Sequence, residues 1–434
     1  MIKIANVKIW EHKVGVASWD TDKGYANFEY YPEFIKLGLN IAPLWMPAAS
    51  SNDGVVFSFP FLNEETYKGL PGLLADTLPD KFGNSIIDAW LARQGRTGED
   101  FTSVERLCYT GSRGMGALEF YPIENKAANK TVSVEVKELV SLAQEMMVSR
   151  KDLTASVNGG DEQKQEALQD IIRVGTSAGG ARPKAIIAMN KDGKVLSGQG
   201  DVPKGYEHYL LKFDGVNDIE LGAPAGYGRI EFAYYNMAID AGIKMTESRL
   251  LEENGRAHFL TKRFDRNGNK KLHLQSLCGL AHYDFNQAGM YSYEQAFAVM
   301  RQIGLTQAEI TQQYTRMVFN VIARNQDDHT KNIAFLMNEK GDWSLSPAFD
   351  MTYSHDPKSK WVDQHQMSVN GKRRGFKRED LIAVGKSQGI KSYESIIESV
   401  SKVVSKWEYY AKTAGVKDSR IAEIADSHRK HLLK

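Results

Sequence analysis

The chain has 434 residues, of which 42% are hydrophobic and 25% charged, and its formal net charge is +1. This length predicts two or three domains or lobes, and the composition is typical of a globular protein. The near-neutral charge excludes an overall attraction to nucleic acid, so any basic patch must be local. With only Cys108 and Cys278, a disulfide framework and a cysteine-rich zinc site are excluded.

The N-terminal stretch lacks the apolar run of a signal peptide, and no stretch approaches the length of a membrane span. We therefore expect a cytoplasmic protein with no membrane partner.

Residues 1–124 predict a compact α+β unit. We expect short strands at 7–10, 14–17 and 28–30, helices from residue 32 and over 80–93, and a strand at 118–122. Pro122 cannot donate to a strand ladder and ends the last of these strands. Residues 124–131 are polar and predict a linker into the second part of the chain, residues 125–434.

Helices are expected over 134–149 and 162–172, on either side of a break at 158–161. The loop at 173–184 then brings together small residues and two cations, Arg182 and Lys184. Small residues let backbone N–H groups approach a phosphate, and the cations favour the same ligand. The competing interpretation is a hairpin bend before a strand at 185–189.

A second strand, at 209–213, carries Lys212 inside an apolar run. Such a lysine costs free energy unless an anion pairs with it, which favours a contact with nucleotide phosphates. The alternative is an edge strand with Lys212 facing water. Glu231 is expected to open the next helix, either orienting Lys212 as the αC glutamate of protein kinases does or lying on the surface.

Residues 258–266 predict a strand that ends a first lobe, at the place where a hinge would meet adenine. The remainder is expected to be mainly helical, notably over 293–303 and 393–414. Between these helices, Thr306 and Glu309 form a capping-box pair that begins an amphipathic helix.

That helix leads to Asp327, with Asn332 five positions later, the spacing of a kinase catalytic loop. There the aspartate accepts the proton of the substrate hydroxyl and the asparagine binds Mg²⁺. Two short strands, 333–337 and 343–345, separate this loop from a second metal-binding acid, Asp350. The competing interpretation is a polar loop whose Asp and Asn are turn residues.

A basic cluster, residues 371–378, contains Lys372, Arg373, Arg374 and Lys377 around one aromatic residue. Such clusters neutralise nucleic-acid phosphates without reading bases. A solvated loop beside the acids at 379 and 380 explains the same charges.

Taken together, these motifs resemble the HipA family of toxin kinases over almost the whole chain. The matching residues are 14–15, 78–80 and 114–117 in the N-terminal part, and 177–184, 211–212, 263–266, Asp327, His329, Lys331, Asn332, Phe349 and Asp350 in the core. The resemblance implies an α+β fold: a HipA N-terminal subdomain (1–124) and a two-lobed kinase core of the phosphoinositide 3/4-kinase type. The N-lobe part of the core would extend to about residue 266, and residues 267–434 would form a helical C-lobe.

The resemblance also implies a role for each matched residue. Asp327 would be the catalytic base, and Asn332 and Asp350 would bind Mg²⁺. The nucleotide would meet Gly179, Gly180, Ala181, Arg182, Pro183, Lys184, Lys212, Lys262, Arg263, Phe264, His329, Lys331 and Phe349. Ser177, with Thr176 as the neighbouring alternative, would be the autophosphorylation site that silences the enzyme.

As implied function, the chain would be the toxin of a type II toxin–antitoxin pair, a Ser/Thr kinase using ATP and Mg²⁺. Its substrate would belong to translation, an aminoacyl-tRNA synthetase such as glutamyl-tRNA synthetase. Its partners would be a HipB-like helix-turn-helix antitoxin and, through it, operator DNA. The alternatives are a kinase-shaped co-repressor and a small-molecule kinase.

The chain departs from the best-known HipA at three places that bear on the substrate. Asp328 stands where a glycine is found there, Arg182 and Pro183 replace a Gln-Glu pair, and Lys262 replaces an acid.

Overall fold

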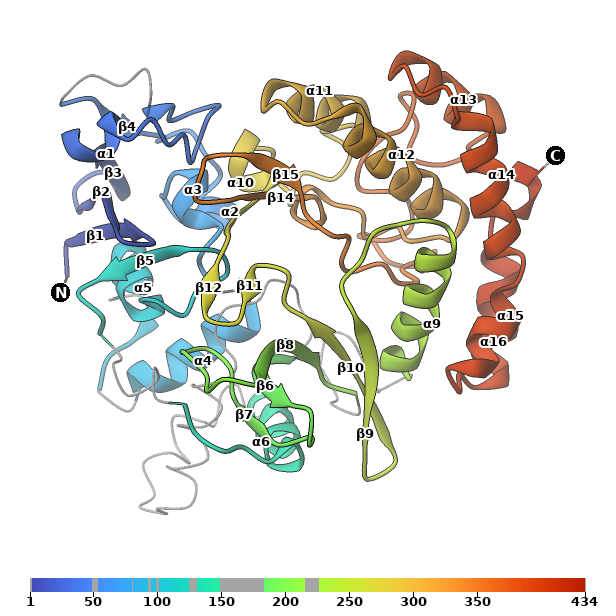
Figure 1. Cartoon of the computed structure of the whole chain (residues 1–434), viewed down its shortest axis with the longest axis horizontal. Coiled ribbons are helices and arrows are strands. Elements are labelled where there is room, and N and C mark those ends of the chain that lie inside the picture. Colours follow the sequence, from blue (N-terminus) through green and yellow to red (C-terminus); the bar gives the residue numbers. More distant parts are fainter. Residues whose placement is uncertain are drawn as a thin grey trace. The chain divides into compact units, whose positions relative to one another are not determined.

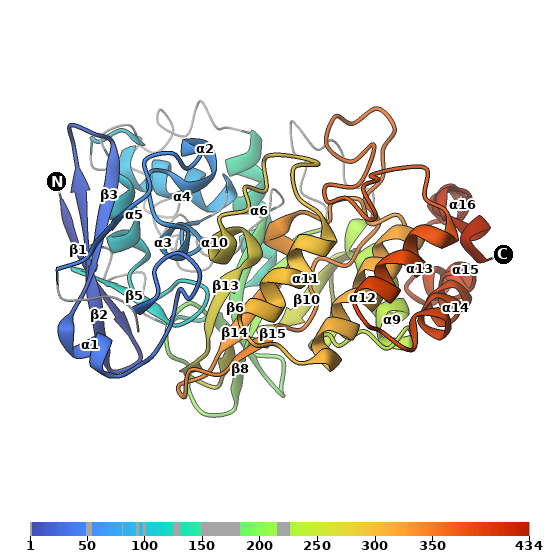
Figure 2. The same ribbon diagram turned by 90° about the horizontal axis from the view of Figure 1, so that it is seen from above.

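The computed structural model describes residues 2–48, 54–79, 81–92, 95–98, 101–124, 131–148, 183–214 and 226–433 (Figures 1 and 2). The chain divides into two compact units. Unit 1 comprises Met1–Ala225, Arg249–Leu274 and Met337–Gly341, and unit 2 comprises Gly226–Ser248, Gln275–Leu336 and Asp342–Lys434.

Unit 1 begins with a five-stranded antiparallel sheet in the order β4-β3-β2-β1-β5. Its strands are β1 (Ile4–Ile9), β2 (His12–Asp20), β3 (Tyr25–Tyr30), β4 (Val56–Ser58) and β5 (Leu118–Tyr121). Alternate residues of β3 are buried, as a sheet with one covered face requires. The helices of this part are α1 (Pro32–Lys36), α2 (Glu64–Tyr67), α3 (Gly72–Ala75), α4 (Lys81–Ala92) and α5 (Ser103–Thr110).

A second five-stranded sheet of unit 1 has the order β7-β6-β8-β10-β9. It consists of β6 (Lys184–Asn190), β7 (Val195–Ser197), β8 (Tyr206–Lys212), β9 (Ser248–Glu253) and β10 (Arg256–Lys262), and is followed by β11 (Arg266–Asn267) and β12 (Lys270–Lys271). An apolar core joins this sheet to α4, α5 and α6 (Val136–Val148) through Ile86, Tyr109, Leu139, Ile187 and Leu211. The N-terminal part and the second sheet therefore share one core.

Unit 2 is mainly helical. Its elements are α9 (Tyr227–Asp240), α10 (Leu277–Ala281), α11 (Tyr293–Gln302), α12 (Gln307–Ile322), η4 (Thr330–Asn332), β14 (Ala334–Met337), β15 (Trp343–Leu345), α13 (Arg378–Ser387), α14 (Tyr393–Val404), α15 (Trp407–Thr413), α16 (Asp418–Ser427) and η5 (Lys430–Leu433). A further strand, β13 (His273–Ser276), begins in unit 1 and ends in unit 2, and the end residues Ser248 of β9 and Met337 of β14 likewise belong to the other unit.

The central helix of unit 2 is α12, which packs against α11 and α14 (Figures 1 and 2). The predicted capping box is present, since Glu309 N–H donates to Thr306 Oγ1 and Thr306 N–H to Glu309 Oε2. The helix is buried almost throughout from Gln313 to Ile322, so the loop that follows starts from a fixed end. No helix of the described residues is long and apolar enough to cross a membrane.

Three predicted elements differ from the structure. The helix expected to open at Glu231 begins at Tyr227, after Gly226, and Glu231 is buried, so its surface interpretation is wrong. The strand expected over 258–266 ends at Lys262, because the following residues turn. The helix expected over 393–414 is two helices, α14 and α15, separated at residues 405–406. The predicted helix at 162–172 and the break before it lie outside the described residues.

Candidate active site

The predicted catalytic loop follows the buried end of α12 and is held by the amide side chain of Asn325. Its Nδ2 donates to Asn320 Oδ1 at 3.0 Å and to the Asp350 carbonyl at 3.3 Å. Gln326 N–H donates to the Ser354 carbonyl at 2.9 Å. These bonds tie the loop both to the helix before it and to the segment after Asp350, so the two predicted acidic positions belong to one hydrogen-bonded framework.

Asp327 keeps part of its carboxylate open. The side chain is 38% exposed, and its Oδ1 accepts a hydrogen bond from Trp361 Nε1 at 2.7 Å. Within the described residues, Oδ2 has no hydrogen-bond partner. Asn332 Nδ2 donates to the Asp327 backbone carbonyl at 2.8 Å, which fixes the two ends of the predicted Asp–Asn motif against each other. One oxygen is thus available to accept a proton from an incoming hydroxyl.

His329 and Lys331 lie on the same loop and share an aromatic neighbour. His329 Nε2 is 3.8 Å from Asp327 Oδ1, and its ring centroid is 5.4 Å from that of Phe285. Lys331 Nζ lies 4.8 Å from the centre of the Phe285 ring, a cation–π contact. Phe285 therefore contacts both loop side chains without neutralising the charge of Lys331.

Asp350 has a left-handed backbone, with φ of 53°. This conformation is uncommon for any residue other than glycine, and Asp and Asn tolerate it best. Asp350 and its neighbour Phe349 are both half-buried. A strained backbone at a predicted metal ligand is consistent with a position selected for function.

Asp328, beside the exposed Asp327, is buried and fully bonded. Its carboxylate accepts hydrogen bonds from Tyr293, His365 and the backbone of Gln366. Burial by itself would raise the pKa of Asp328, but His365 and these hydrogen bonds outweigh it and hold the pKa below its ordinary value. The two adjacent acids therefore have opposite environments.

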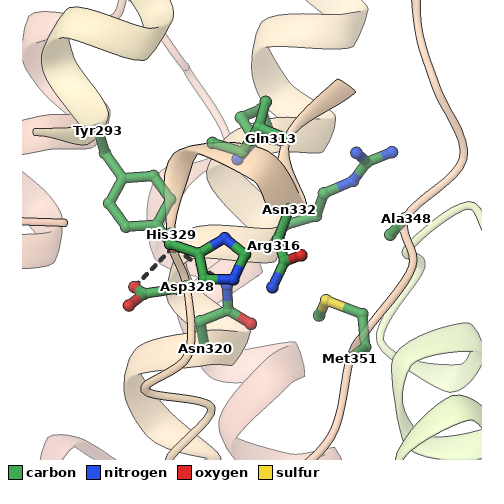
Figure 3. A pocket seen from close by; sticks show the side chains of 10 residues that line it. Tyr293, Gln313, Arg316, Asn320, Asp328, His329, Asn332, Ala348 and Met351 are labelled. Atoms are coloured by element: carbon green, nitrogen blue, oxygen red, sulfur yellow. Dashed lines mark hydrogen bonds between the residues drawn. The ribbon is translucent and has the colours of Figure 1, made fainter. Parts of the chain in front are cut away.

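A small pocket of about 20 Å³, room for about one water molecule, lies between α11, α12 and the catalytic loop (Figure 3). Its lining includes Tyr293, Asn320, Asp328, His329 and Asn332. The Tyr293 hydroxyl, which donates to Asp328, also accepts from Asn320 Nδ2 at 3.0 Å. The loop is thus linked to α11 and α12 through hydrogen-bonded polar side chains at this pocket.

Unit 1 contains the predicted phosphate-contacting lysines. Lys184, at the start of β6, is directly opposite Lys212 of β8 in the antiparallel register. Directly paired strand residues have Cβ atoms about 5 Å apart, and two like charges there are destabilising. Pro183 and Lys184 are buried, and Lys212 Nζ is 5.8 Å from the centre of the Phe259 ring. Thr176, Ser177, Gly179, Gly180, Ala181 and Arg182 lie outside the described residues.

The predicted hinge residues have side chains engaged within unit 1. Lys262 Nζ forms an ion pair with Glu207 at 2.5 Å, and both side chains are partly exposed. Arg263 is buried, and its guanidinium donates twice to Asp265, at 2.6 and 2.9 Å. The Arg263 N–H donates to the His208 carbonyl. Phe264 is half-buried. The Arg263 side chain is therefore held by Asp265 inside unit 1.

Asp265 is the centre of this turn. It also accepts hydrogen bonds from Arg266 Nη1 at 2.5 Å and from the Gly116 N–H at 2.7 Å. Burial by itself would raise the pKa of Asp265, but the two arginines outweigh it and hold the pKa far below its ordinary value. Arg266 Nη2 donates to the Gly114 carbonyl at 2.9 Å. The turn therefore fastens the second sheet to the N-terminal part of unit 1.

The four cations of the basic cluster in unit 2 differ in their exposure to solvent. Lys372 pairs with Asp380 at 2.8 Å, and Arg373 Nε donates to the His365 carbonyl at 2.6 Å. Arg374 and Lys377 are exposed. Only these last two present side chains to solvent without an ion-pair partner among the described residues.

No group of three or more His, Cys, Asp or Glu side chains that could hold a metal occurs in the described ranges. A Mg²⁺ ion held by one carboxylate, one amide oxygen and phosphates does not need such a group.

Sequence reasoning missed four residues that surround the catalytic loop: Trp361, His365, Gln366 and Arg429. They come from loops and from the C-terminal end, where no periodicity or motif marks them. The only available signal for Trp361 was a large aromatic in a polar segment.

Comparison with protein families gives two matches. The HipA N-terminal domain family matches residues 5–121, and the HipA-like C-terminal domain family matches residues 176–407. A search of curated proteins found no match.

Among solved structures, HipA in the Shewanella oneidensis MR-1 complex of HipA, HipB and operator DNA is similar in fold. Its TM-score is 0.66 at 13% identity, covering 99% of this chain and 96% of that one. The Helicobacter pylori proinflammatory kinase CtkA matches with a TM-score of only 0.33 at 13% identity, over 50% of this chain and 89% of that one. A score this low carries no argument.

The architecture is thus that of a mixed α/β protein with antiparallel sheets and a helical unit, similar to HipA. The chain belongs to the HipA family, as the predicted resemblance indicated.

Proposed function

We propose that the chain is the kinase toxin of a toxin–antitoxin pair, transferring the γ-phosphoryl group of ATP to a Ser or Thr hydroxyl. Asp327 carries the proposal. It lies at the end of a buried helix, its rotamer is held through Oδ1, and Oδ2 is open to take a hydroxyl proton. A base held in this way satisfies the geometric requirement of general base catalysis.

The nucleotide phosphates are proposed to contact the lysines of unit 1. Lys184 and Lys212 are directly opposite each other in the strand pair, so a single polyanion can contact both cations. The loop before Lys184, with Gly179, Gly180, Ala181 and Arg182, is proposed to add backbone N–H groups and one further cation. Backbone groups near Lys262 and Phe264 are proposed to meet the adenine.

Mg²⁺ is proposed to bind the oxygen donors of unit 2, Asn332 and Asp350. When bound, the ion neutralises charge on the transferring phosphates. Asn332 is anchored to the Asp327 carbonyl through its amide nitrogen, which leaves the amide oxygen for the ion. His329 Nε2 lies 3.8 Å from Asp327 Oδ1, and Lys331 adds a positive charge on the same loop.

Ser177, or its neighbour Thr176, is proposed as a self-phosphorylation site. A phosphate there would bring nearly two negative charges into the segment that covers the ATP phosphates. ATP affinity should then fall, and the enzyme should silence itself. The external substrate is proposed to be a translation component such as glutamyl-tRNA synthetase, on the strength of the family alone.

The protein partner is proposed to be a HipB-like helix-turn-helix antitoxin. The similar HipA was solved with HipB and operator DNA, and this chain covers almost its whole length. Exposed Arg374 and Lys377 favour an additional contact with operator phosphates. They also support the second candidate function, a kinase-shaped co-repressor that acts without phosphoryl transfer.

The experiment is incubation of the purified protein with γ-labelled ATP and Mg²⁺, alone and with a cell extract, followed by mass spectrometry. Kinase activity predicts label on Ser177 or Thr176 and on one extract protein, and weak ATP binding by the labelled enzyme. No label on any protein would favour the co-repressor, and label in small molecules alone would favour a small-molecule kinase.

A further inference from the structure

The two acids of the catalytic loop are connected through a ring of contacts that lies entirely in unit 2. Trp361 Nε1–H donates to Asp327 Oδ1 at 2.7 Å. The Gln366 side-chain amide donates to the Trp361 carbonyl. The Gln366 backbone N–H donates to Asp328 Oδ1 at 2.8 Å, and Asp328 is bonded covalently to Asp327. These contacts therefore form a closed ring that starts and ends at Asp327.

Asp328 anchors this ring in the core of unit 2. Its Oδ2 accepts from His365 Nδ1 at 2.7 Å and from the Tyr293 hydroxyl at 2.8 Å. Arg429, near the C-terminal end, contacts His365 Nε2 at 2.9 Å. Because an arginine can only donate, these partners assign His365 the neutral tautomer with its proton on Nδ1.

The charges of the anchor agree with this tautomer. Burial lowers the pKa of His365, which favours the neutral ring, although Asp328 opposes the shift. Burial and the nearby Asp328 carboxylate raise the pKa of Tyr293 well above its ordinary value, so its hydroxyl remains a donor. Arg429 also contacts Gln326 Oε1 at 2.8 Å. The anchor thus presents a fixed set of donors to Asp328.

The contact of Trp361 with Asp327 is of a kind that orients a group without competing for its proton. An indole N–H can only donate, so it neither takes the proton of the substrate nor blocks the second oxygen. Trp361 is itself only half-buried, and its ring centroid is 6.4 Å from that of His329. Its main polar contact is therefore with the base rather than with the core.

We propose that Trp361 is a positioning residue for the base: its indole N–H fixes the Asp327 carboxylate with Oδ2 toward the substrate hydroxyl, and the Gln366–Asp328 link holds Trp361 in place. The proposal rests on the proposed kinase function. It makes the segment that follows Asp350 part of the catalytic apparatus, since releasing Trp361 would free the rotamer of the base. Misplacement of a catalytic group by about 1 Å can cost up to about 10²-fold in rate.

The test compares Trp361→Phe with the matched control Trp343→Phe, which alters a half-buried tryptophan of β15 in the same unit. The measurement is label transfer from γ-labelled ATP to protein in a cell extract at rising ATP. For Trp361→Phe, the maximal rate should fall between about tenfold and 10²-fold, while the ATP concentration giving half that rate stays unchanged. The control should keep both values.

A second variant guards against a folding artefact. Gln366→Leu opens the ring without touching Asp327 and should lower the maximal rate in the same direction, by less than Trp361→Phe. Thermal unfolding of all variants identifies any that fail to fold. A folded Trp361→Phe enzyme with the wild-type maximal rate would overturn the proposal. Absence of transfer by the wild-type protein would instead overturn the proposed function.

Discussion

Two loops of the molecule carry aspartates whose surroundings are opposite. At the turn from Arg263 to Arg266 in unit 1, the Asp265 side chain is completely buried and both of its oxygens are bonded. In the catalytic loop of unit 2, the Asp327 side chain is 38% exposed and one oxygen is open within the described residues. Asp265 can therefore act only in stabilising the fold, whereas Asp327 can accept a proton.

The catalytic loop repeats this contrast over two adjacent residues. Asp328 is bonded as completely as Asp265, and it takes the structural role next to the open Asp327. Type and spacing of residues therefore do not separate a structural acid from a reactive one. The two kinds of acid differ in how many of their carboxylate oxygens already accept hydrogen bonds in the folded protein.

The largest effect is expected from Asp265→Asn. The change leaves Arg263 and Arg266 buried without their carboxylate, and breaking a buried pair of this kind costs about 3–5 kcal/mol. Denaturant unfolding of the ligand-free protein measures the loss. The control is Glu207→Gln, which removes the partly exposed pair with Lys262 and should cost less than about 1 kcal/mol. Equal losses for the two variants would contradict the structural role of Asp265.

Lowering the pH is expected to reduce the free energy of unfolding of both units, whereas each of these substitutions acts at one place. Burial lowers the pKa of His273 in unit 1 to about 4 and that of His428 in unit 2 to about 3. Both stay neutral when folded, while the unfolded chain binds protons below about pH 6.5. The free energy of unfolding should thus fall as the pH decreases from about 6.5 toward 4, by about 1.4 kcal/mol per histidine and pH unit.

The measurement for this second prediction is denaturant unfolding at a series of pH values. Between pH 6 and 4.5, the free energy of unfolding of His273→Gln should depend on pH less steeply than that of the wild-type protein, by about the contribution of one histidine. An unchanged slope would show that His273 is not a neutral buried group.

A ligand-dependent effect is expected from Asp350→Asn. Asn tolerates the left-handed backbone as Asp does, so stability without ligand should change little. Loss of the carboxylate should weaken binding of ATP with Mg²⁺ by at least about tenfold, or about 1.4 kcal/mol. Calorimetry with and without Mg²⁺ separates the two contributions. Unchanged affinity in the presence of Mg²⁺ would remove Asp350 from the metal site.

The smallest effect is expected at the basic cluster. Replacing exposed Arg374 and Lys377 by Ala should lower the salt slope of operator binding by the antitoxin complex by about two, one for each lost phosphate contact. Lys372→Ala should change the slope less, because that lysine already pairs with Asp380. The control is Lys391→Ala, an exposed lysine outside the cluster. If the double variant keeps the wild-type slope, the cluster is a solvated loop.

Much of the fold was predictable from local patterns. The capping box of α12 predicts the start of that helix because neighbouring residues determine it, whereas β3 was predicted only over its second half, residues 28–30. The start of α9 was not predictable from Glu231, since the glycine before Tyr227 sets it and the helix is buried by tertiary packing. No helix-breaking residue separates α14 from α15, so the sequence gives no local signal that the helix is interrupted there.

The Asp–Asn spacing predicts the proposed catalytic loop, but it does not predict the residues that contact this loop. Trp361 and His365 reach it from a segment without periodic pattern, and Arg429 reaches it from the C-terminal end. These contacts depend on how distant parts of unit 2 come together, which a single sequence does not encode locally. The same reason explains why the burial of Asp328 could not be predicted.

The decisive test of Asp327 as the base is the rate of phosphoryl transfer from ATP by Asp327→Asn, measured beside Asp328→Asn with the unfolding temperature of each. Asp327→Asn should lose about 10²–10⁴-fold in rate and keep the wild-type unfolding temperature, because only the proton acceptor is gone. Asp328→Asn should lower the unfolding temperature, because its carboxylate anchors buried donors. Transfer by Asp327→Asn at the wild-type rate would contradict the assignment of Asp327 as the base.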